Sequence, residues 1–342
     1  MQNKSATAAT GVNEGIVFQD HAAIGKAEDI PVSASATPVV SVSPVVLSAP
    51  GRGGDVQIDL QIRVSAPTAG RDLPILLLSH GQGGSNHLSS LNGYGPLVNF
   101  WAAHGFVVIQ PTHLSSKTLS LDPKTSGAPF FWRSRVEDMT LILDHLDDVE
   151  ASVPEIQGRL DRSRVAVAGH SMGGHTAGML LGAQLTDEDG MKVDMAEPRI
   201  KAGVLLTPPG NGGADLAGLA VGIPFLRHPS FAEMTTPTLV VVGDSDVNPN
   251  LTVRGADWHA DPYFLSTGPK CLLTIVGGGH LLGGVSGYDA AETTDESPER
   301  VATVQRLTWA YLRSALCPED SAWTVACAAL AELKELGRVE CK

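Results

Sequence analysis

Positive charge is scarce in this chain of 342 residues. Its 24 Lys and Arg residues stand against 37 Asp and Glu residues, which gives a formal net charge of −13. A chain of this charge repels nucleic-acid phosphates and anionic lipid headgroups, so we expect no nucleic-acid partner. Long apolar runs are also missing. Because a membrane-spanning helix needs about 18 or more consecutive apolar residues, we expect no membrane span.

Cysteine is scarce as well. The four cysteines, Cys271, Cys317, Cys327 and Cys341, show no C-x-x-C spacing, so we expect no zinc site and no other metal or cofactor. A Cys317–Cys327 bridge is open, but four free thiols in a reducing compartment is the interpretation that we favour. Residues 1–25 lack the apolar core of a secretory signal, which favours a cytoplasmic protein.

The order of the apolar runs predicts an α/β protein. Residues 1–36 are rich in Ala, Ser, Thr and Gly and are expected to form a loosely held arm. Residues 38–50 and 55–67 have the composition and the intervening turn residues of an antiparallel strand pair. Six continuous apolar runs follow, as expected for strands covered on both faces, at 73–81, 106–113, 164–171, 202–210, 238–246 and 271–280.

Helical periodicity separates some of these runs. Apolar residues recur at helical spacing in 133–149 and in a last long helix, for which Ser297 and Pro298 provide a cap and a first helical residue. Alternating strands and helices predict a mostly parallel sheet in one domain, residues 37–342. Residues 209–236 form a connection longer than most in such folds, and we expect a lid or a pocket wall there.

One of these runs ends in a sequence that is typical of a catalytic nucleophile. Residues 169–173 read Gly-His-Ser-Met-Gly, which fits G-x-S-x-G, and a stretch able to form a helix follows. A sharp strand-to-helix turn leaves no room for a Cβ beside the serine and lifts its hydroxyl above the sheet. We therefore predict that Ser171 is a nucleophile; the alternative is a Gly/Ser turn that only caps the helix.

A serine hydroxyl needs a base, and the base needs an orienting acid. Two later runs end in suitable residues, Asp244 and Asp246 after one and His280 after the next. The carboxyl ends of parallel strands meet at one edge of the sheet, where open α/β folds hold their active sites. We prefer His280 as the base, with His259 as the rival, and Asp246 rather than Asp244 as the acid.

The oxyanion formed by attack on a carbonyl also needs donors. The Gly-rich turn at 80–84 exposes backbone N–H groups, and we predict the amides of Gln82 and Met172 as the two donors. The alternative for this turn is a purely packing role. Five further residues are candidates for contact with substrate, although for His113 and His170 we favour a structural, hydrogen-bonded role over one as a second base, and Trp132 can equally pack in the core. They are Gly81, Gly83, His113, Trp132 and His170.

These motifs together resemble the α/β-hydrolase superfamily, and within it the branch of chlorophyllases, platelet-activating-factor acetylhydrolases and bacterial polyester hydrolases. The matching pieces, "LLLSHGQGGS", "FVVIQPTHLSS", "RVEDMTLILDHL", "VAVAGHSMGGHTA", "VVVGDSD" and "GGGH", cover residues 73–280 in the same order. The resemblance implies a mostly parallel sheet with antiparallel N-terminal strands, helices on both faces and a small lid. It also implies Ser171, Asp246 and His280 as the triad.

The favoured function is therefore a serine carboxylic-ester hydrolase that acts through an acyl-serine on a neutral or hydrophobic small-molecule ester. The same residues could serve an amidase or a lactonase, because acyl transfer does not fix the leaving group. A ligand-binding homologue without turnover is the alternative from another class. The sequence leaves both a monomer and a homodimer open.

Overall fold

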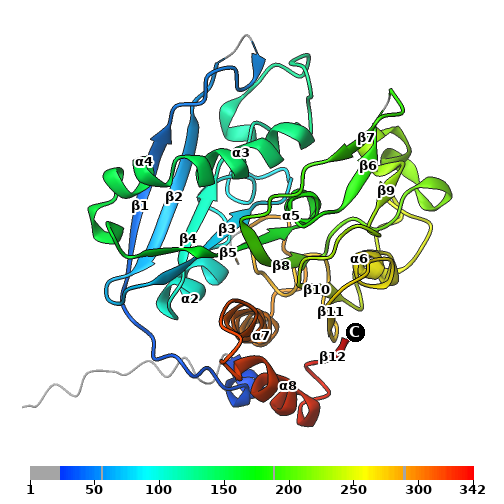
Figure 1. Ribbon diagram of the computed structural model, residues 1–342. Helices are drawn as coiled ribbons and strands as arrows, with labels where there is room; N and C mark the ends of the chain where they lie inside the picture. Colours follow the sequence, from blue (N-terminus) through cyan, green and yellow to red (C-terminus); the bar gives the residue numbers. More distant parts are fainter. Residues whose placement is uncertain (1–23, 55–56, 188, 288–289) are drawn as a thin grey trace, which may run out of the picture.

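The computed structural model of the protein describes residues 24–54, 57–187, 189–287 and 290–342. Its main sheet has the strand order β1-β2-β4-β3-β5-β8-β10-β11-β12 (Figure 1). The central strands are parallel, while β2 pairs antiparallel with β1 and β4, and β12 antiparallel with β11. The bounds are β1 Val39–Leu47, β2 Leu60–Pro67, β3 Leu73–Ser79, β4 Val107–Pro111, β5 Leu160–His170, β8 Ile200–Leu206, β10 Thr238–Gly243, β11 Lys270–Ile275 and β12 Gly337–Cys341.

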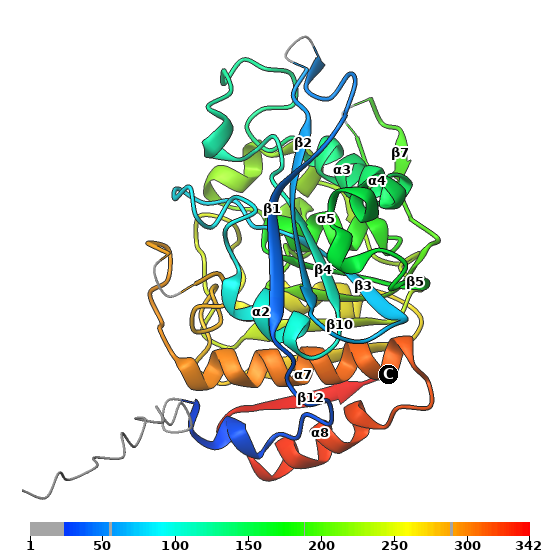
Figure 2. The same ribbon diagram turned by 90° about the vertical axis from the view of Figure 1, so that its left-hand side faces the viewer.

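Helices cover both faces of this sheet (Figures 1 and 2). Strands β3, β4, β10 and β11 are buried along their whole length, which explains why their sequences are continuous apolar runs. Two hydrophobic cores result, one on each face. One face carries α3 Trp132–Asp144, α4 Leu146–Ser152 and α5 Met172–Leu180, and the other carries α2 Gly95–Ala103, α7 Pro298–Leu316 and α8 Ala322–Glu332. The predicted α/β-hydrolase fold is confirmed.

Helix α7 begins as the sequence predicts. The side chain of Ser297 accepts a hydrogen bond from the amide of Arg300, and Pro298 is the first helical residue. The predicted helix over 133–149 is instead two helices, α3 and α4, because the backbone leaves helical geometry at His145. The 38–50 and 55–67 prediction holds for β1 and β2, whereas residues 55–56 lie outside the described part.

The prediction of a loose arm is wrong for residues 24–36. A short helix, η1 Gly25–Asp29, packs against α7, and Ala27 and Ile30 are fully buried there (Figure 2). Arg306 of α7 donates a hydrogen bond to the carbonyl oxygen of Ile30 at 2.6 Å. Because residues 1–36 consist mostly of small and polar residues, the sequence does not reveal that Ala27 and Ile30 are buried. Residues 1–23 of the predicted arm lie outside the described residues.

The long connection at 209–236 folds into short turns of 3-10 helix and a two-residue strand. Phe225 and Leu226 are buried in it, whereas Leu219 is 79% exposed. The segment is thus anchored in the core at several points, and Leu219 presents an apolar side chain to solvent between two of them, Leu216 and Ala220. Its bounds, with the remaining short elements, are η3 Lys117–Leu119, η4 Pro154–Ile156, β6 Gln184–Thr186, β7 Lys192–Asp194, η5 Gly213–Asp215, η6 Gly218–Gly222, η7 Pro224–Leu226, β9 Pro229–Ser230, η8 Ala256–Ala260 and α6 Asp261–Phe264.

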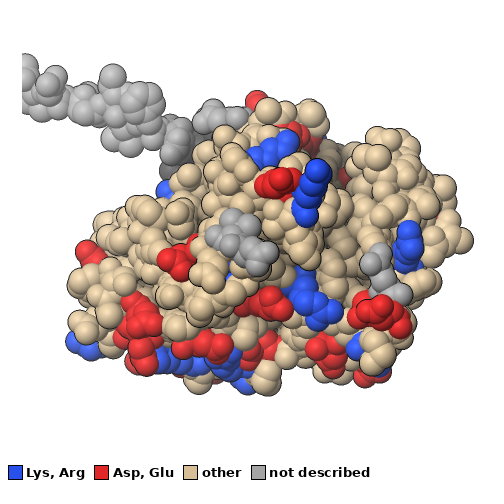
Figure 3. Space-filling view, turned by 90° about the horizontal axis from the view of Figure 1, so that it is seen from above, with Lys and Arg blue, Asp and Glu red and all other residues tan. Residues whose placement is uncertain are grey.

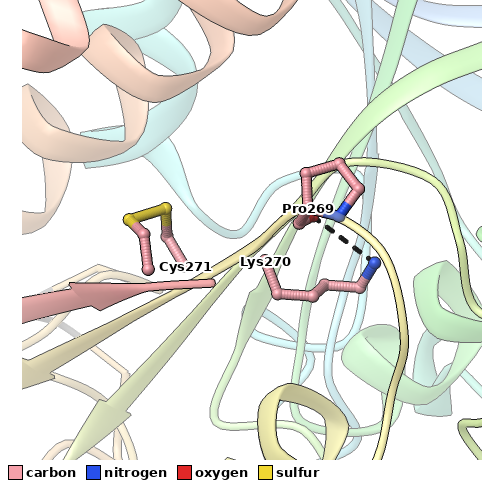
Figure 4. Close-up of a disulfide and its surroundings, with 4 residues drawn as sticks. Pro269, Lys270 and Cys271 are labelled. Atoms are coloured by element: carbon pink, nitrogen blue, oxygen red, sulfur yellow. Dashed lines mark hydrogen bonds between the residues drawn. A yellow bond between two sulfur atoms is a disulfide. The ribbon is translucent and has the colours of Figure 1, made fainter.

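The prediction of four free thiols is wrong. Cys271 of β11 and Cys341 of β12 form a disulfide, while Cys317 and Cys327 remain free, so the open Cys317–Cys327 bridge is also absent (Figure 4). The antiparallel register places Cys271 directly opposite Cys341, which brings the two Sγ atoms within bonding distance. Structural disulfides are typical of oxidising compartments. The expected cytoplasmic location therefore gains no support and stays a prediction.

The surface is acidic in places and largely uncharged elsewhere. Seen from above, Asp and Glu side chains gather along one edge of the molecule with Lys and Arg among them, and much of the remaining face carries no charge (Figure 3). Within the described ranges, we find no helix of the length and apolarity that crossing a bilayer requires.

Candidate active site

Ser171 lies at a strained turn between β5 and α5. Its φ of 54° and ψ of −118° are unusual for a residue with a side chain. The flanking glycines make this turn possible. A Cβ at Gly169 would lie 1.9 Å from the carbonyl oxygen of Gly173, and a Cβ at Gly173 would lie 2.0 Å from that of Ser79. The sequence pattern around Ser171 is therefore required by close backbone contacts.

The structure brings Ser171, His280 and Asp246 together. The Oγ of Ser171 lies 2.9 Å from Nε2 of His280, and Nδ1 of His280 lies 2.8 Å from Oδ2 of Asp246. These residues follow β5, β11 and β10 at the carboxyl edge of the sheet. The other candidate acid, Asp244, accepts hydrogen bonds from the amide of Gly277 and the hydroxyl of Ser245 instead.

Burial differs within this group. The Asp246 side chain is 3% exposed and that of His280 is 32% exposed, so the acid is enclosed while the imidazole can meet a solute. Burial alone would raise the pKa of Asp246, but the hydrogen bond from His280 and the nearby His259 outweigh it and lower the pKa below its usual value. Asp246 is thus an ionised partner for an imidazolium.

The loop that carries His280 is held from both sides by Asp295. Oδ2 of Asp295 accepts hydrogen bonds from the amides of Gly279 at 2.8 Å and Gly283 at 3.0 Å. Asp295 precedes α7 by sequence and no motif pointed to it. A carboxylate that satisfies two amides across four residues fixes the backbone on which His280 stands.

The Gly-rich loop after β3 leaves one particular amide free. Gly81 donates to the hydroxyl of Tyr94 at 2.8 Å, and Gly83 donates to Oγ of Ser89 at 2.8 Å. Within the described residues, the amides of Gln82 and Met172 donate to no other group of the chain. The two predicted oxyanion donors are therefore available, whereas the amides of Gly81 and Gly83 serve the loop itself.

His170 connects the loop to the histidine backbone. Its Nε2 donates to the carbonyl oxygen of His280 at 2.8 Å, and its Nδ1 accepts from the hydroxyl of Tyr94, also at 2.8 Å. Because Tyr94 accepts from Gly81, one line of hydrogen bonds runs from the Gly-rich loop to His280. Burial lowers the pKa of His170 to about 3, so the neutral ring that this line requires is maintained. The structural alternative applies to His170.

His113 is a correction to the predicted substrate-contacting set. Its side chain is fully buried, with Nε2 at 2.9 Å from Oγ of Ser79 and Nδ1 at 2.8 Å from Oδ2 of Asp138. Asp138 also accepts two hydrogen bonds from Arg52, at 2.6 and 3.0 Å. Since both ring nitrogens are used inside the protein, His113 cannot contact a substrate, and its role is structural.

Trp132 belongs to an aromatic wall. Its ring centroid lies 6.2 Å from that of Phe225, which in turn lies 5.4 Å from Phe130 and 4.8 Å from His175. Phe130, Trp132 and Phe225 line a cavity of about 320 Å³. His175 stands one helical turn after Ser171, and its amide donates to the carbonyl oxygen of Ser171. The wall thus adjoins the helix that begins at the strained serine.

His259, which the sequence names as a rival base, lies beside Asp246. Its Nε2 lies 3.1 Å from Oδ2 of Asp246, the same oxygen that His280 contacts. Asp246, His259 and His280 offer three potential metal-ligand atoms within 4.8 Å of one another. Oδ2 of Asp246 already accepts a hydrogen bond from Nδ1 of His280 and also faces Nε2 of His259, so this carboxylate oxygen is shared by the two imidazoles.

A serine at such a turn, linked through a histidine to an aspartate from successive strand ends of this sheet, is the arrangement of an α/β-hydrolase. No family model matches the chain. It is 28% identical over 166 residues to Cutinase est1 of Thermobifida alba, and 27% identical over 165 residues both to Cutinase 1 of Thermobifida cellulosilytica and to Cutinase of Thermobifida fusca (strain YX).

Each of these matches covers 48% of this chain, and they cover 40%, 45% and 39% of the three relatives in that order. The chain therefore spans less than half the length of the curated relatives that it matches. The resemblance to α/β-hydrolases, and within them to bacterial polyester hydrolases, is confirmed.

Proposed function

We propose that the protein is a serine carboxylic-ester hydrolase that acts on neutral or hydrophobic esters. One observation carries this proposal, the placement of His280 between the Ser171 hydroxyl and the Asp246 carboxylate, at 2.9 and 2.8 Å. The relatives that are 27–28% identical to it over 48% of the chain are named cutinases, which favours esters over amides.

In the proposed mechanism, Ser171 Oγ attacks the ester carbonyl carbon while its proton passes to Nε2 of His280. Asp246 accepts a hydrogen bond from Nδ1–H of the resulting imidazolium and stabilises its charge. The amides of Gln82 and Met172 donate to the oxyanion. The intermediate then collapses, the ester C–O bond breaks, and His280 returns the proton to the departing alcohol.

Water completes the cycle in the second half. His280 takes a proton from the water as its oxygen attacks the acyl-serine, and returns that proton to Ser171 Oγ when the acid leaves. The 32% exposure of the His280 side chain allows a water molecule or an alcohol to reach Nε2. The enclosed Asp246 keeps its charge directed at the imidazole.

The aromatic wall supports an apolar acyl or alkyl group as the part of the substrate that is bound. Phe130, Trp132 and Phe225 offer ring surface beside α5, and the cavity of about 320 Å³ has the size of a small-molecule site. An amidase or lactonase on the same machinery is the second candidate, because the triad places no demand on the leaving group.

Turnover of a short p-nitrophenyl ester by the wild-type chain and by Ser171→Ala tests the proposal. We expect the variant to lose at least about 10⁴-fold in kcat. A fluorophosphonate probe should label the wild type and not the variant. Unchanged turnover in Ser171→Ala would reject the nucleophile, and a folded wild type that is neither labelled nor active would favour the ligand-binding alternative. A panel of acyl lengths, aryl esters, lactones and amides then separates the enzymatic candidates.

A further inference from the structure

Two imidazoles share one oxygen of Asp246. Nδ1 of His280 lies at 2.8 Å and Nε2 of His259 at 3.1 Å from the same Oδ2. The mechanism above uses only the first contact. His259 is 2% exposed and reaches Asp246 from η8, an element that does not otherwise belong to the site.

A contact with a backbone carbonyl places one proton on the His259 ring. Its Nδ1 lies 2.7 Å from the carbonyl oxygen of Pro208, and a carbonyl can only accept, so Nδ1 carries a hydrogen. In the neutral ring, Nε2 is then an acceptor that faces an acceptor, the Asp246 carboxylate. Only a second proton on the ring turns this 3.1 Å contact into a hydrogen bond.

On balance the surroundings of His259 lower its pKa and favour the neutral ring. Burial lowers the pKa of His259 and His280 acts in the same direction, whereas Asp246 and Asp261 raise it. Asp261 is itself paired with Arg254 at 2.8 Å, which weakens its pull. The neutral His170 also faces this cluster, with its ring centroid 5.1 Å from that of His280. One carboxylate charge therefore serves two imidazoles.

We propose that His259 is a titratable positioning residue for the Ser171–His280–Asp246 triad. It faces the same carboxylate oxygen of Asp246 as His280 does, and when it is protonated it donates a hydrogen bond to that oxygen and takes part of the charge that the His280 imidazolium needs. Through Pro208, this fourth residue also ties the acid to the start of the 209–236 segment. The inference rests on the proposed function and adds a regulation by protonation to it.

The test compares two substitutions that separate hydrogen-bond donation to Asp246 from titration of the side chain. His259→Gln can still donate an N–H group to Asp246 but cannot titrate, whereas His259→Leu removes both properties at similar volume. The measured quantity is the rate at which a fluorophosphonate labels Ser171 between pH 4.5 and 9, since this rate is independent of the natural substrate. His145→Gln is the matched control, because His145 also pairs with an aspartate, Asp148, at 2.7 Å on the surface.

We expect the wild-type labelling rate to fall in two steps as the pH is lowered, with the lower step below the ordinary histidine value of about 6.5. His259→Gln should show one step. At pH 8 this variant should label about 2- to 10-fold more slowly than the wild type, because glutamine donates to Asp246 at every pH. His259→Leu should also show one step, but at pH 8 it should label within about twofold of the wild type, because the neutral His259 donates no hydrogen bond to Asp246 either. His145→Gln should match the wild type. Wild-type rates and an unchanged pH profile in both His259 variants, with unfolding temperatures preserved, would overturn the proposal.

Histidine nitrogen NMR on the intact wild-type protein keeps the inference separate from the proposed function and from any folding defect of the variants. The His259 signals are assigned from their loss in His259→Gln. A proton on Nδ1 at every pH, with Nε2 gaining one at low pH, supports the inference even if the wild type is not labelled. A hydrogen on Nε2 in the neutral ring contradicts it.

Discussion

Ser171, His280 and Asp246 are joined by hydrogen bonds of 2.9 and 2.8 Å, and Ser79, His113 and Asp138 are joined by bonds of the same two lengths. The molecule thus contains two Ser–His–Asp lines with equal contact distances. Only the first includes a strained serine, since Ser79 lies within the regular strand β3.

The two lines differ in access and in charge. His113 has no exposed side-chain surface, while His280 is 32% exposed. Asp138 receives two hydrogen bonds from the guanidinium of Arg52, so its charge is already balanced, whereas Asp246 is contacted by two imidazoles. Burial, Arg135 and Arg52 lower the pKa of His113 well below its usual value, which makes it a poor base. The comparison teaches that three correct distances do not define a catalytic site.

The largest expected effect comes from substituting the two aspartates. Asp246→Asn should lower ester turnover by about 10⁴-fold through loss of the correct His280 state, with little change in stability. Asp138→Asn should instead cost about 3–5 kcal/mol of unfolding free energy, because the buried Arg52 loses its partner. Turnover per folded molecule and urea unfolding measure the two effects. Catalytic loss in Asp138→Asn without destabilisation would break the comparison.

Acid should destabilise the protein, because several buried histidines resist protonation in the folded state. The pKa values of His80, His113 and His170 are all lowered by burial, to about 3 for His170. The unfolded chain takes up these protons near pH 6.5 and the folded chain does not, so stability is present above that pH and is lost as the pH falls toward the folded value. Each group should add about 1.4 kcal/mol per pH unit to the slope of unfolding free energy. Urea unfolding between pH 7.5 and 4 measures this slope, and a flat profile down to pH 5 would contradict it.

Tyr94→Phe sharpens the comparison at the line that surrounds His280. Loss of the hydroxyl leaves the Gly81 amide and Nδ1 of His170 without a partner, which should cost about 1–3 kcal/mol. The shifted Gly-rich loop should lower kcat by about tenfold. Tyr311→Phe is the matched control, because it removes another buried hydroxyl, on α7. Equal kinetic effects in both variants would show that Tyr94 has no special link to the site.

The smallest expected effect concerns the aromatic wall. Phe225→Ala should raise KM severalfold for esters with long or aromatic acyl groups and leave acetyl esters unchanged, because a lost pocket contact is worth about 1–3 kcal/mol. Ratios of kcat/KM across an acyl series measure it. A uniform change over the series would mean that Phe225 supports the fold rather than the substrate site.

The sequence predicts the sheet and the triad because both leave local signals. Continuous apolar runs mark the strands buried on two faces, and the polar residues just after them mark the sheet edge. Ser171 also needs flanking glycines at a sharp turn, which a pattern can record. Sequence position also favours Asp246 over Asp244, because Asp246 lies further past the end of the strand. In the structure Asp244 accepts hydrogen bonds within the turn, whereas Asp246 contacts His280.

Other features depend on contacts across the chain and leave no such signal. Strand β12, "GRVEC", has no apolar run, and its pairing with β11 is what brings Cys341 to Cys271. The burial of His113 follows from Arg52 and Asp138, which are 86 residues apart. His259 stood out only as a rival base, because its contact with Asp246 is set by the packing of η8 against β10.

The disulfide between Cys271 and Cys341 links two residues that are 70 positions apart. It therefore turns the chain from β11 to β12 into a covalent ring that contains His280, α7 and α8. A single peptide-bond cleavage inside this ring, for example near the exposed Thr294 or Glu296, releases no fragment until the disulfide is reduced. In a nicked molecule the disulfide would hold both sides of the cut to β11. Because β11 lies beside β10, the loop that carries His280 would stay next to the strand that precedes Asp246.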